Sequence, residues 1–114
     1  AYSSYWQLPE PPTDLTVTAV QNAIELSFTP PSRYMQYRVY RVDPDGFQIL
    51  LDTVEQCSYR VTITDETDLT DGSYGYFVVP VHPNLLKNGS PLTGQPSETR
   101  WIAVWHTGLF LPNL

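Results

Sequence analysis

Prolines divide this 114-residue chain into short segments, and their spacing constrains the fold more than any other feature of the sequence. There are 11 prolines, about twice the usual share, and they are spread along the chain and not gathered in one block. Between them the chain is rich in threonine, valine, tyrosine and isoleucine, which favour strands over helices. The sequence therefore predicts an all-β chain, in which only Asn84 to Lys87 could form a single helical turn.

Short runs of alternating apolar and polar residues recur at roughly ten-residue spacing, as expected for half-buried strands. Turn signals such as Gln21-Asn22 and the segment from Asp43 to Gly46 separate these runs, and we expect a long loop from His82 to Pro96. Seven such strands are typical of an all-β sandwich. The expected strands lie at residues 15–20, 24–29, 36–42, 47–54, 58–64, 74–81 and from 98 to 104 or 105.

The chain length suits one domain with a single hydrophobic core. Hydrophobic residues make up 41% and charged residues 16%, so the chain is expected to fold. The one cysteine, Cys57, excludes an intrachain disulfide, and we expect it to be a core or edge residue and not a catalytic thiol. We expect a linker or expression remnant at 1–8, the domain at 9–105, and a C-terminal extension or link to a next domain at 106–114.

Acidic residues outnumber basic residues by 12 to 6, which gives a net charge of −6 and a pI near 4.5. Nucleic acids and anionic membranes attract clusters of lysine and arginine, whereas the basic residues here are scattered among acidic ones. The longest apolar run, at 76–81, is far shorter than the roughly twenty residues that a membrane-spanning helix needs. We therefore expect neither a nucleic-acid partner nor membrane insertion.

Several of these segments, taken in order, resemble a fibronectin type III domain. The first strand is similar from Pro12 to Val17 and the second from Ile24 to Pro31, where Phe28 stands in the position at which the family usually has tryptophan. The sixth strand is similar from Tyr74 to Val81. The resemblance makes Tyr74 the counterpart of the tyrosine corner, whose hydroxyl bonds back to the turn before it.

This resemblance covers residues 9 to about 105 and implies a seven-stranded, immunoglobulin-like β-sandwich without catalytic activity. It implies a spacer or binding module of a larger extracellular, cell-surface or phage-tail protein, with a protein partner or neighbouring domains of the same chain. The loop before the last strand lacks the Arg-Gly-Asp of integrin-binding members. Bacterial and phage modules are more similar than animal ones, because lysine is scarce and Phe28 replaces the tryptophan.

No motif for catalysis or cofactor binding is found. The two histidines, His82 and His106, fall in a loop and in the C-terminal tail, and neither lies in a catalytic motif. The acids from Asp65 to Asp71 offer oxygen ligands for calcium, but without the EF-hand spacing a solvated acidic loop is the simpler interpretation. Asn88-Gly89-Ser90 matches a glycosylation sequon, but Asn-Gly also favours a tight turn, which we prefer. We predict no enzyme activity, no cofactor and no metal site.

The sixth strand is unusual because it has no polar face. Phe77 and Val79 point away from the core if their neighbours in the strand point toward it. Beside the third strand of the expected sandwich, Tyr40 and Val42 would join them in an outward apolar patch, and such patches mark interfaces. The alternative is that the C-terminal segment at 105–114 folds back and covers the patch.

Tryptophans suggest a second kind of site, because aromatic rings can also stack on sugars. Trp101 and Trp105, near the end of the last strand, would form the platform, with a cell-surface glycan as the ligand. Such recognition needs coplanar rings on one face with polar neighbours. The predicted function is a non-catalytic structural or protein-interaction module, with a carbohydrate-binding module as the alternative.

Overall fold

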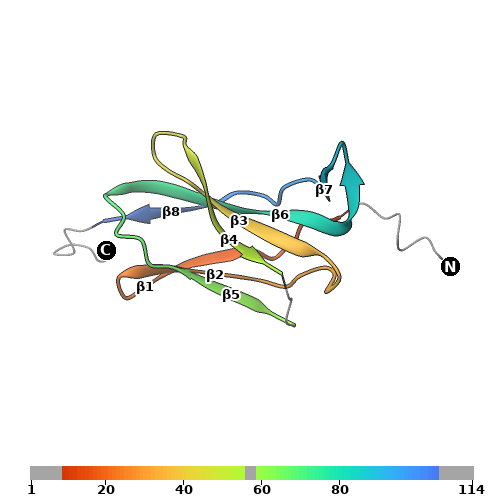
Figure 1. The fold of residues 1–114 in the computed structure, drawn as a ribbon. Coiled ribbons are helices and arrows are strands. Elements are labelled where there is room, and N and C mark those ends of the chain that lie inside the picture. Colours follow the sequence, from red (N-terminus) through yellow and green to blue (C-terminus); the bar gives the residue numbers. More distant parts are fainter. Residues whose placement is uncertain (1–8, 56–58, 106–114) are drawn as a thin grey trace.

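The computed structural model describes residues 9–55 and 59–105, and in these ranges it contains strands and no helix (Figure 1). The expected all-β class is confirmed. Two antiparallel sheets face each other as the layers of a sandwich. The strands are β1 (Thr16–Val20), β2 (Ala23–Phe28), β3 (Gln36–Val42), β4 (Gln48–Val54), β5 (Val61–Asp65), β6 (Gly72–Lys87), β7 (Ser90–Thr93) and β8 (Arg100–Val104).

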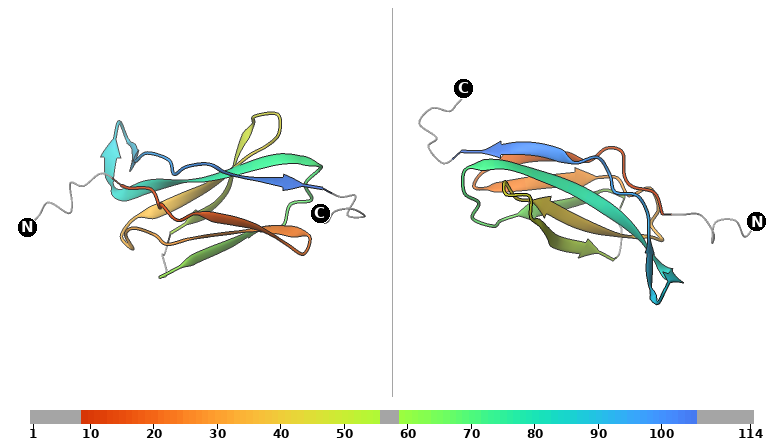
Figure 2. Two further views of the ribbon diagram at one scale, coloured as in Figure 1. Left: turned by 180° about the vertical axis from the view of Figure 1, so that it is seen from behind. Right: turned by 90° about the horizontal axis from the view of Figure 1, so that it is seen from above.

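The smaller sheet has the order β1-β2-β5, and the larger has the order β4-β3-β6-β7 with β8 also paired to β6. Strand β6 is long enough for β8 and β7 to pair with it one after the other. β8 pairs with β6 from Gly72 to Tyr76, and β7 pairs with it from Val81 to Lys87. Figure 2 shows β6 running along the larger sheet toward the hairpin that it forms with β7.

Alternating side chains of β2 and β3 form the centre of the core. Leu26 and Phe28 of β2 and Tyr37 and Val39 of β3 are fully buried, and the rings of Phe28 and Tyr37 meet edge to face with their centroids 5.7 Å apart. Burial changes at every residue along both strands, which confirms the alternation expected from the sequence. This packing requires no disulfide.

The segment expected as a loop from 82 to 96 instead continues β6 to Lys87 and returns as β7, so the described residues form eight strands. Asn88 and Gly89 join them, and both have positive φ angles, 55° and 83°, as a two-residue type I′ turn requires. The turn interpretation of Asn88-Gly89 is confirmed, whereas the helical turn at Asn84 to Lys87 is wrong. Pro83 does not end β6 because the β6–β7 ladder skips from His82 to Leu86.

The fifth strand begins later than expected, at Val61. Tyr59 is 92% exposed, so it does not continue the inward alternation of Val61 and Ile63. Residues 56–58, which include Cys57, lie outside the described residues. The predicted terminal segments 1–8 and 106–114 lie outside them as well.

Two tyrosine hydroxyls hold loops against the sandwich through hydrogen bonds. The Tyr74 hydroxyl donates a hydrogen bond of 2.8 Å to the carbonyl oxygen of Thr70, and this is the bond to the preceding turn that the resemblance implied. The Tyr37 hydroxyl donates to the carbonyl of Ser32 and accepts from its backbone N–H. Both rings are buried, so each bond satisfies a polar group that would otherwise lose contact with water.

The described chain enters and leaves at opposite ends of the sandwich (Figure 2). At the entry, the backbone of Pro9 passes so close to Gly94 that a Cβ atom there would collide with it. At the exit, Trp105 lines a groove together with Val20 and Asn22, beside the β1–β2 turn. The long axis of the domain therefore separates the two ends of the described chain.

Candidate interaction surface

The outer face of the larger sheet brings together the four residues expected in an apolar patch. Tyr40 lies directly opposite Phe77 across β3 and β6, and their rings stack at 5.1 Å between centroids and 12° between planes. Val42 and Val79 flank this pair on the same face, because side chains of alternate residues share one side of a strand. Phe77 itself is only 9% exposed, because Tyr40 stacks on it.

Two residues that the sequence did not connect with this patch extend it on either side. Leu50 of β4 lies opposite Tyr40 and is 49% exposed. Trp101 of β8 lies opposite Gly75 of β6 and is 58% exposed. We call Tyr40, Val42, Leu50, Phe77, Val79 and Trp101 together the outer-sheet patch.

Trp101 lies flat on the sheet because its partner is a glycine. A Cβ atom on Gly75 would lie 3.0 Å from both Cε3 and Cη2 of Trp101 and 2.7 Å from Cγ2 of Thr99. The six-membered ring of the indole therefore rests on the backbone of Gly75, and its other side faces solvent. An aromatic side chain that covers a strand glycine in this way shields the backbone there.

The outer-sheet patch carries little charge, although the chain as a whole has a net charge of −6. Among the described strands β3, β6 and β8, the residues that share this face include one charged side chain, Arg38, which lies opposite Val79. The carboxylates gather instead at 43–45 and 65–71, at one end of the sandwich. An apolar, nearly uncharged sheet face is typical of a surface that contacts another molecule.

The structure places the two tryptophans of the predicted sugar platform in different surroundings. Trp101 belongs to the outer-sheet patch. Trp105 is 71% exposed and lines a groove of about 470 Å³ with Val20 and Leu69 at the end of the sandwich. Trp101 therefore lies flat on a sheet face, as a ring that stacks on a sugar would, whereas Trp105 lines a groove at the end of the sandwich.

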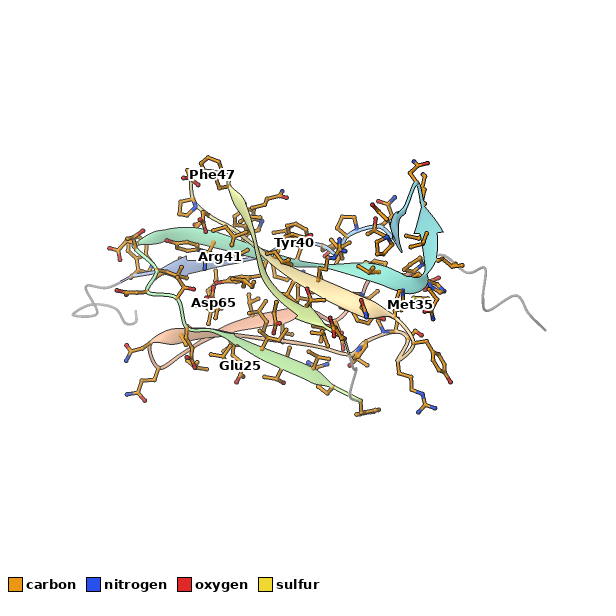
Figure 3. All side chains as sticks on the ribbon, viewed as in Figure 1. Glu25, Met35, Tyr40, Arg41, Phe47 and Asp65 are labelled. Carbon is orange, nitrogen blue, oxygen red and sulfur yellow. The ribbon has the colours of Figure 1, made fainter. Side chains whose placement is uncertain are left out.

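A buried ion pair, which the sequence analysis missed, connects the two sheets. Nη1 of Arg41 on β3 donates to Oδ2 of Asp65 on β5 at 3.1 Å, and Nε donates to Oδ1 of Asp43 at 2.7 Å. The hydroxyl of Tyr76 donates to Oδ2 of Asp65 at 2.8 Å, and the N–H of Thr67 donates to Oδ1. Arg41 and Asp65 are 5% and 4% exposed and point toward each other between the layers (Figure 3).

Hydrogen bonding keeps this pair charged in spite of its burial. Burial by itself raises the pKa of Asp65, but hydrogen bonds from Tyr76, Thr67 and Arg41 outweigh it, and the pKa of Asp65 is lowered. Burial by itself lowers the pKa of Arg41, but its bonds to Asp43 and Asp65 raise it overall. Burial and the bond to Asp65 raise the pKa of Tyr76, so its phenol remains a donor.

The alternation of β3 contained the signal for this pair. Arg41 follows Tyr37 and Val39 at the inward positions of the strand, although arginine is seldom buried. Asp65 was expected in a solvated acidic loop, and that expectation is wrong because Asp65 ends β5 and turns inward. Glu66 and Asp68, which follow, are exposed as expected.

The remaining candidates for chemistry do not come together as a site. His82 lies in β6 and not in a loop; it is 7% exposed, and its Nδ1 accepts a hydrogen bond from the N–H of Asn84 at 3.2 Å. His106 lies outside the described residues. Within 9–55 and 59–105, no three histidine, cysteine, aspartate or glutamate side chains are placed to hold a metal ion. No helix in these ranges has the length and apolar character to cross a membrane.

Comparison with known proteins relates this chain to others by fold alone. No family model and no curated protein matches the sequence. A similar solved structure is a pectate lyase from Pectobacterium carotovorum, with a TM-score of 0.53 and 22% identity over 77% of this chain. This chain spans about a quarter, 26%, of the length of that enzyme.

Proposed function

We propose that this chain is a fibronectin type III-like module that acts as a non-catalytic structural and protein-interaction domain of a larger protein. The arrangement of β1-β2-β5 against β4-β3-β6, with β8 beside β6, supports the family. In this proposal seven strands correspond to the family, and β7 is an added hairpin strand. The hydrogen bond of Tyr74 to the turn before it and the buried ring of Phe28 support the same assignment.

The path of the chain supports a role as one module in a series. Because the described chain enters at one end of the sandwich and leaves at the other, domains before and after it would be held apart by its length. In the similar pectate lyase the matched region is likewise part of a much longer chain. The proposed location is extracellular, on a cell surface or in a virion, and it rests on the resemblance to fibronectin type III domains.

The outer-sheet patch is the proposed binding surface, and the exposed Trp101 is the observation that carries this proposal. Aromatic side chains are enriched at protein interfaces, because they bury a large area at a small cost in side-chain entropy. Trp101 lies against the backbone of Gly75, and the rings of Tyr40 and Phe77 stack on each other. A partner would therefore bind a surface that needs little ordering.

Site-specific cross-linking in the longest natural form of the protein tests this surface. A photoreactive benzophenone amino acid replaces Trp101, and in a control it replaces Leu86, which is 67% exposed on the β6–β7 hairpin. We expect peptide conjugates, detected by mass spectrometry, from position 101 in excess over position 86. Equal yields at both positions would contradict the proposal.

A carbohydrate-binding module is the second candidate function, and one observation favours it. The solvent-facing side of Trp101 shares its sheet face with the polar side chains of Gln48 and Ser73. The net charge of −6 favours a neutral glycan over an anionic one. Neutral oligosaccharides should then change the tryptophan fluorescence of the chain and not that of Trp101→Ala; absence of any change excludes this candidate.

A further inference from the structure

One side of the sandwich is open between β4 and β5. Strand β4 is the last strand of the larger sheet and pairs with β3, and β5 is the last strand of the smaller sheet and pairs with β2. No described strand pairs with the other edge of either one. Every second residue of an edge strand directs its backbone N–H and C=O groups away from its partner strand, so both edges offer hydrogen bonds to an added strand.

A groove of about 400 Å³ lies between these two edges. Leu51 and Ile63 line it, and both side chains pack against the hydrophobic core. A β-bulge in the pairing of β3 with β4 leaves Leu51 without a partner on β3, and a bulge of this kind can redirect a side chain. An apolar side chain that enters the groove would therefore reach the edge of the core.

The first part of strand β4, up to Leu51, lacks two of the features that usually protect an edge. From Gly46 to Leu51 there is no charged residue and no proline. Ile49 and Leu50 are 39% and 49% exposed. An uncharged stretch of edge strand with exposed apolar side chains is suited to pairing with another strand.

The rim of the groove is acidic. Asp52 and Glu66 line it, and Glu55 follows β4 directly. None of these three carboxylates forms an ion pair with a described residue. A second copy of this chain would bring its own Asp52 and Glu55 to this rim, which disfavours pairing between two copies.

We propose that this side of the sandwich binds an extended segment of a partner protein that adds as a strand to β4 and carries apolar and basic residues in turn on the face that it directs into the groove. The backbone of the segment pairs with the free edge of β4. Its apolar side chains enter the groove onto Leu51 and Ile63, and its basic side chains face Asp52 and Glu66. This site is an edge of the sandwich and differs from the outer-sheet patch, which lies on a sheet face and shares Leu50 with it.

Nuclear magnetic resonance of the ¹⁵N-labelled chain tests the proposal with a defined probe. The probe is an acetylated and amidated heptapeptide with valine and lysine in turn on one face of the strand and threonine on the other, in the order Val-Thr-Lys-Thr-Val-Thr-Lys. We expect chemical-shift changes at the amides of 48–54 and 63–67, and slower hydrogen exchange of the free-edge amides of β4. Unchanged β4 amides at millimolar peptide would overturn the proposal, and so would changes confined to the outer-sheet patch.

Two control peptides separate strand addition from other modes of binding. N-methylation of alternate backbone nitrogens removes the donors that would face β4, so this peptide should no longer bind. The same peptide with glutamate in place of lysine should not bind because of the acidic rim. Equal binding of either control would contradict the proposed mode.

Charge-reversing substitutions test whether the peptide binds at the acidic rim. Asp52→Lys combined with Glu66→Lys should weaken binding of the lysine peptide at least about fivefold, which corresponds to roughly 1 kcal/mol. Glu98→Lys combined with Glu10→Lys makes the same change in net charge at positions that do not line the groove and should leave the affinity nearly unchanged. Equal weakening by both pairs would show that net charge alone attracts the peptide, and the site would be rejected.

Discussion

At the level of single residues, the buried pair of Arg41 and Asp65 ties the two sheets together. Each charge alone would be costly between the layers, because burial removes its contact with water. The bonds to Asp43, Tyr76 and Thr67 offset that cost by occupying the remaining donors and acceptors. Because β3 and β5 belong to different sheets, this network also favours one alignment of the two layers.

Replacement of Arg41 by methionine should destabilise the domain strongly. Arg41→Met keeps most of the side-chain volume but leaves the carboxylate of Asp65 buried without its counter-charge, which costs about 3 kcal/mol. Urea unfolding followed by tryptophan fluorescence measures the loss. Arg33→Met is the control, because Arg33 is exposed and its loss should change stability by no more than about 0.5 kcal/mol. A similar small change for Arg41→Met would show that the pair contributes little.

The stability that Asp65 provides should disappear in acid. Burial raises the pKa of Asp65, but its hydrogen bonds outweigh burial and hold that pKa below the usual value of 3.8. The unfolded chain therefore takes up the proton first as the pH falls, and stability is lost as the pH falls through the lowered pKa. The difference in unfolding free energy between the natural chain and Asp65→Asn should be constant from pH 7 to 5 and shrink below about pH 4. A difference that does not depend on pH would contradict this account.

At the level of strands, the sequence predicts most readily the strands that bury one face and expose the other. Strands β2 and β3 could be read from their alternation, since each buries one face and exposes the other. Strand β7 could not be read in this way, because Pro83 and Pro91 interrupt the pattern and its four residues are mostly exposed. Only the Asn88-Gly89 turn pointed to the hairpin.

The β6–β7 hairpin should depend on the backbone conformation at its turn. A Cβ atom on Gly89 would meet no atom within 4 Å, so the cost of Gly89→Ala comes from the positive φ of 83° alone. That cost is about 1 to 2 kcal/mol. Hydrogen exchange should show weaker protection of β7 in Gly89→Ala, whereas the exposed-position control Ser90→Ala should retain it. Full protection in both variants would mean that the turn does not limit the hairpin.

The outer-sheet patch could be predicted only in part, for a reason that lies in strand pairing. Tyr40 and Phe77 were expected on one face because each alternates within its own strand. The neighbours Leu50 and Trp101 depend on registers between strands far apart in sequence, and a shift of one residue would turn either side chain to the other face. Long-range register is set by the packed molecule and not by local pattern.

At the level of the whole molecule, charge is distributed unevenly between the two ends of the sandwich. The segments 41–46 and 65–71 carry six acidic residues and one arginine, a net charge of −5 out of −6 for the chain. These segments lie together at the end where the described chain leaves, and Arg41, Asp43, Asp68 and Asp71 line one pocket there. Repulsion among the carboxylates at this end opposes folding.

Neutralising one carboxylate at the crowded end should therefore stabilise the domain. Asp68→Asn removes a charge from an exposed position among like charges and should raise the melting temperature by about 2 °C at low salt. The gain should shrink in about 0.5 M sodium chloride, since salt screens the interaction between exposed charges. Glu10→Gln removes the same charge at the other end of the sandwich, where Pro9 enters, and should give little change. Calorimetry of the three proteins at both salt concentrations checks the prediction. Equal increases in melting temperature for both variants would mean that the net charge limits stability, and not the clustering of carboxylates at one end.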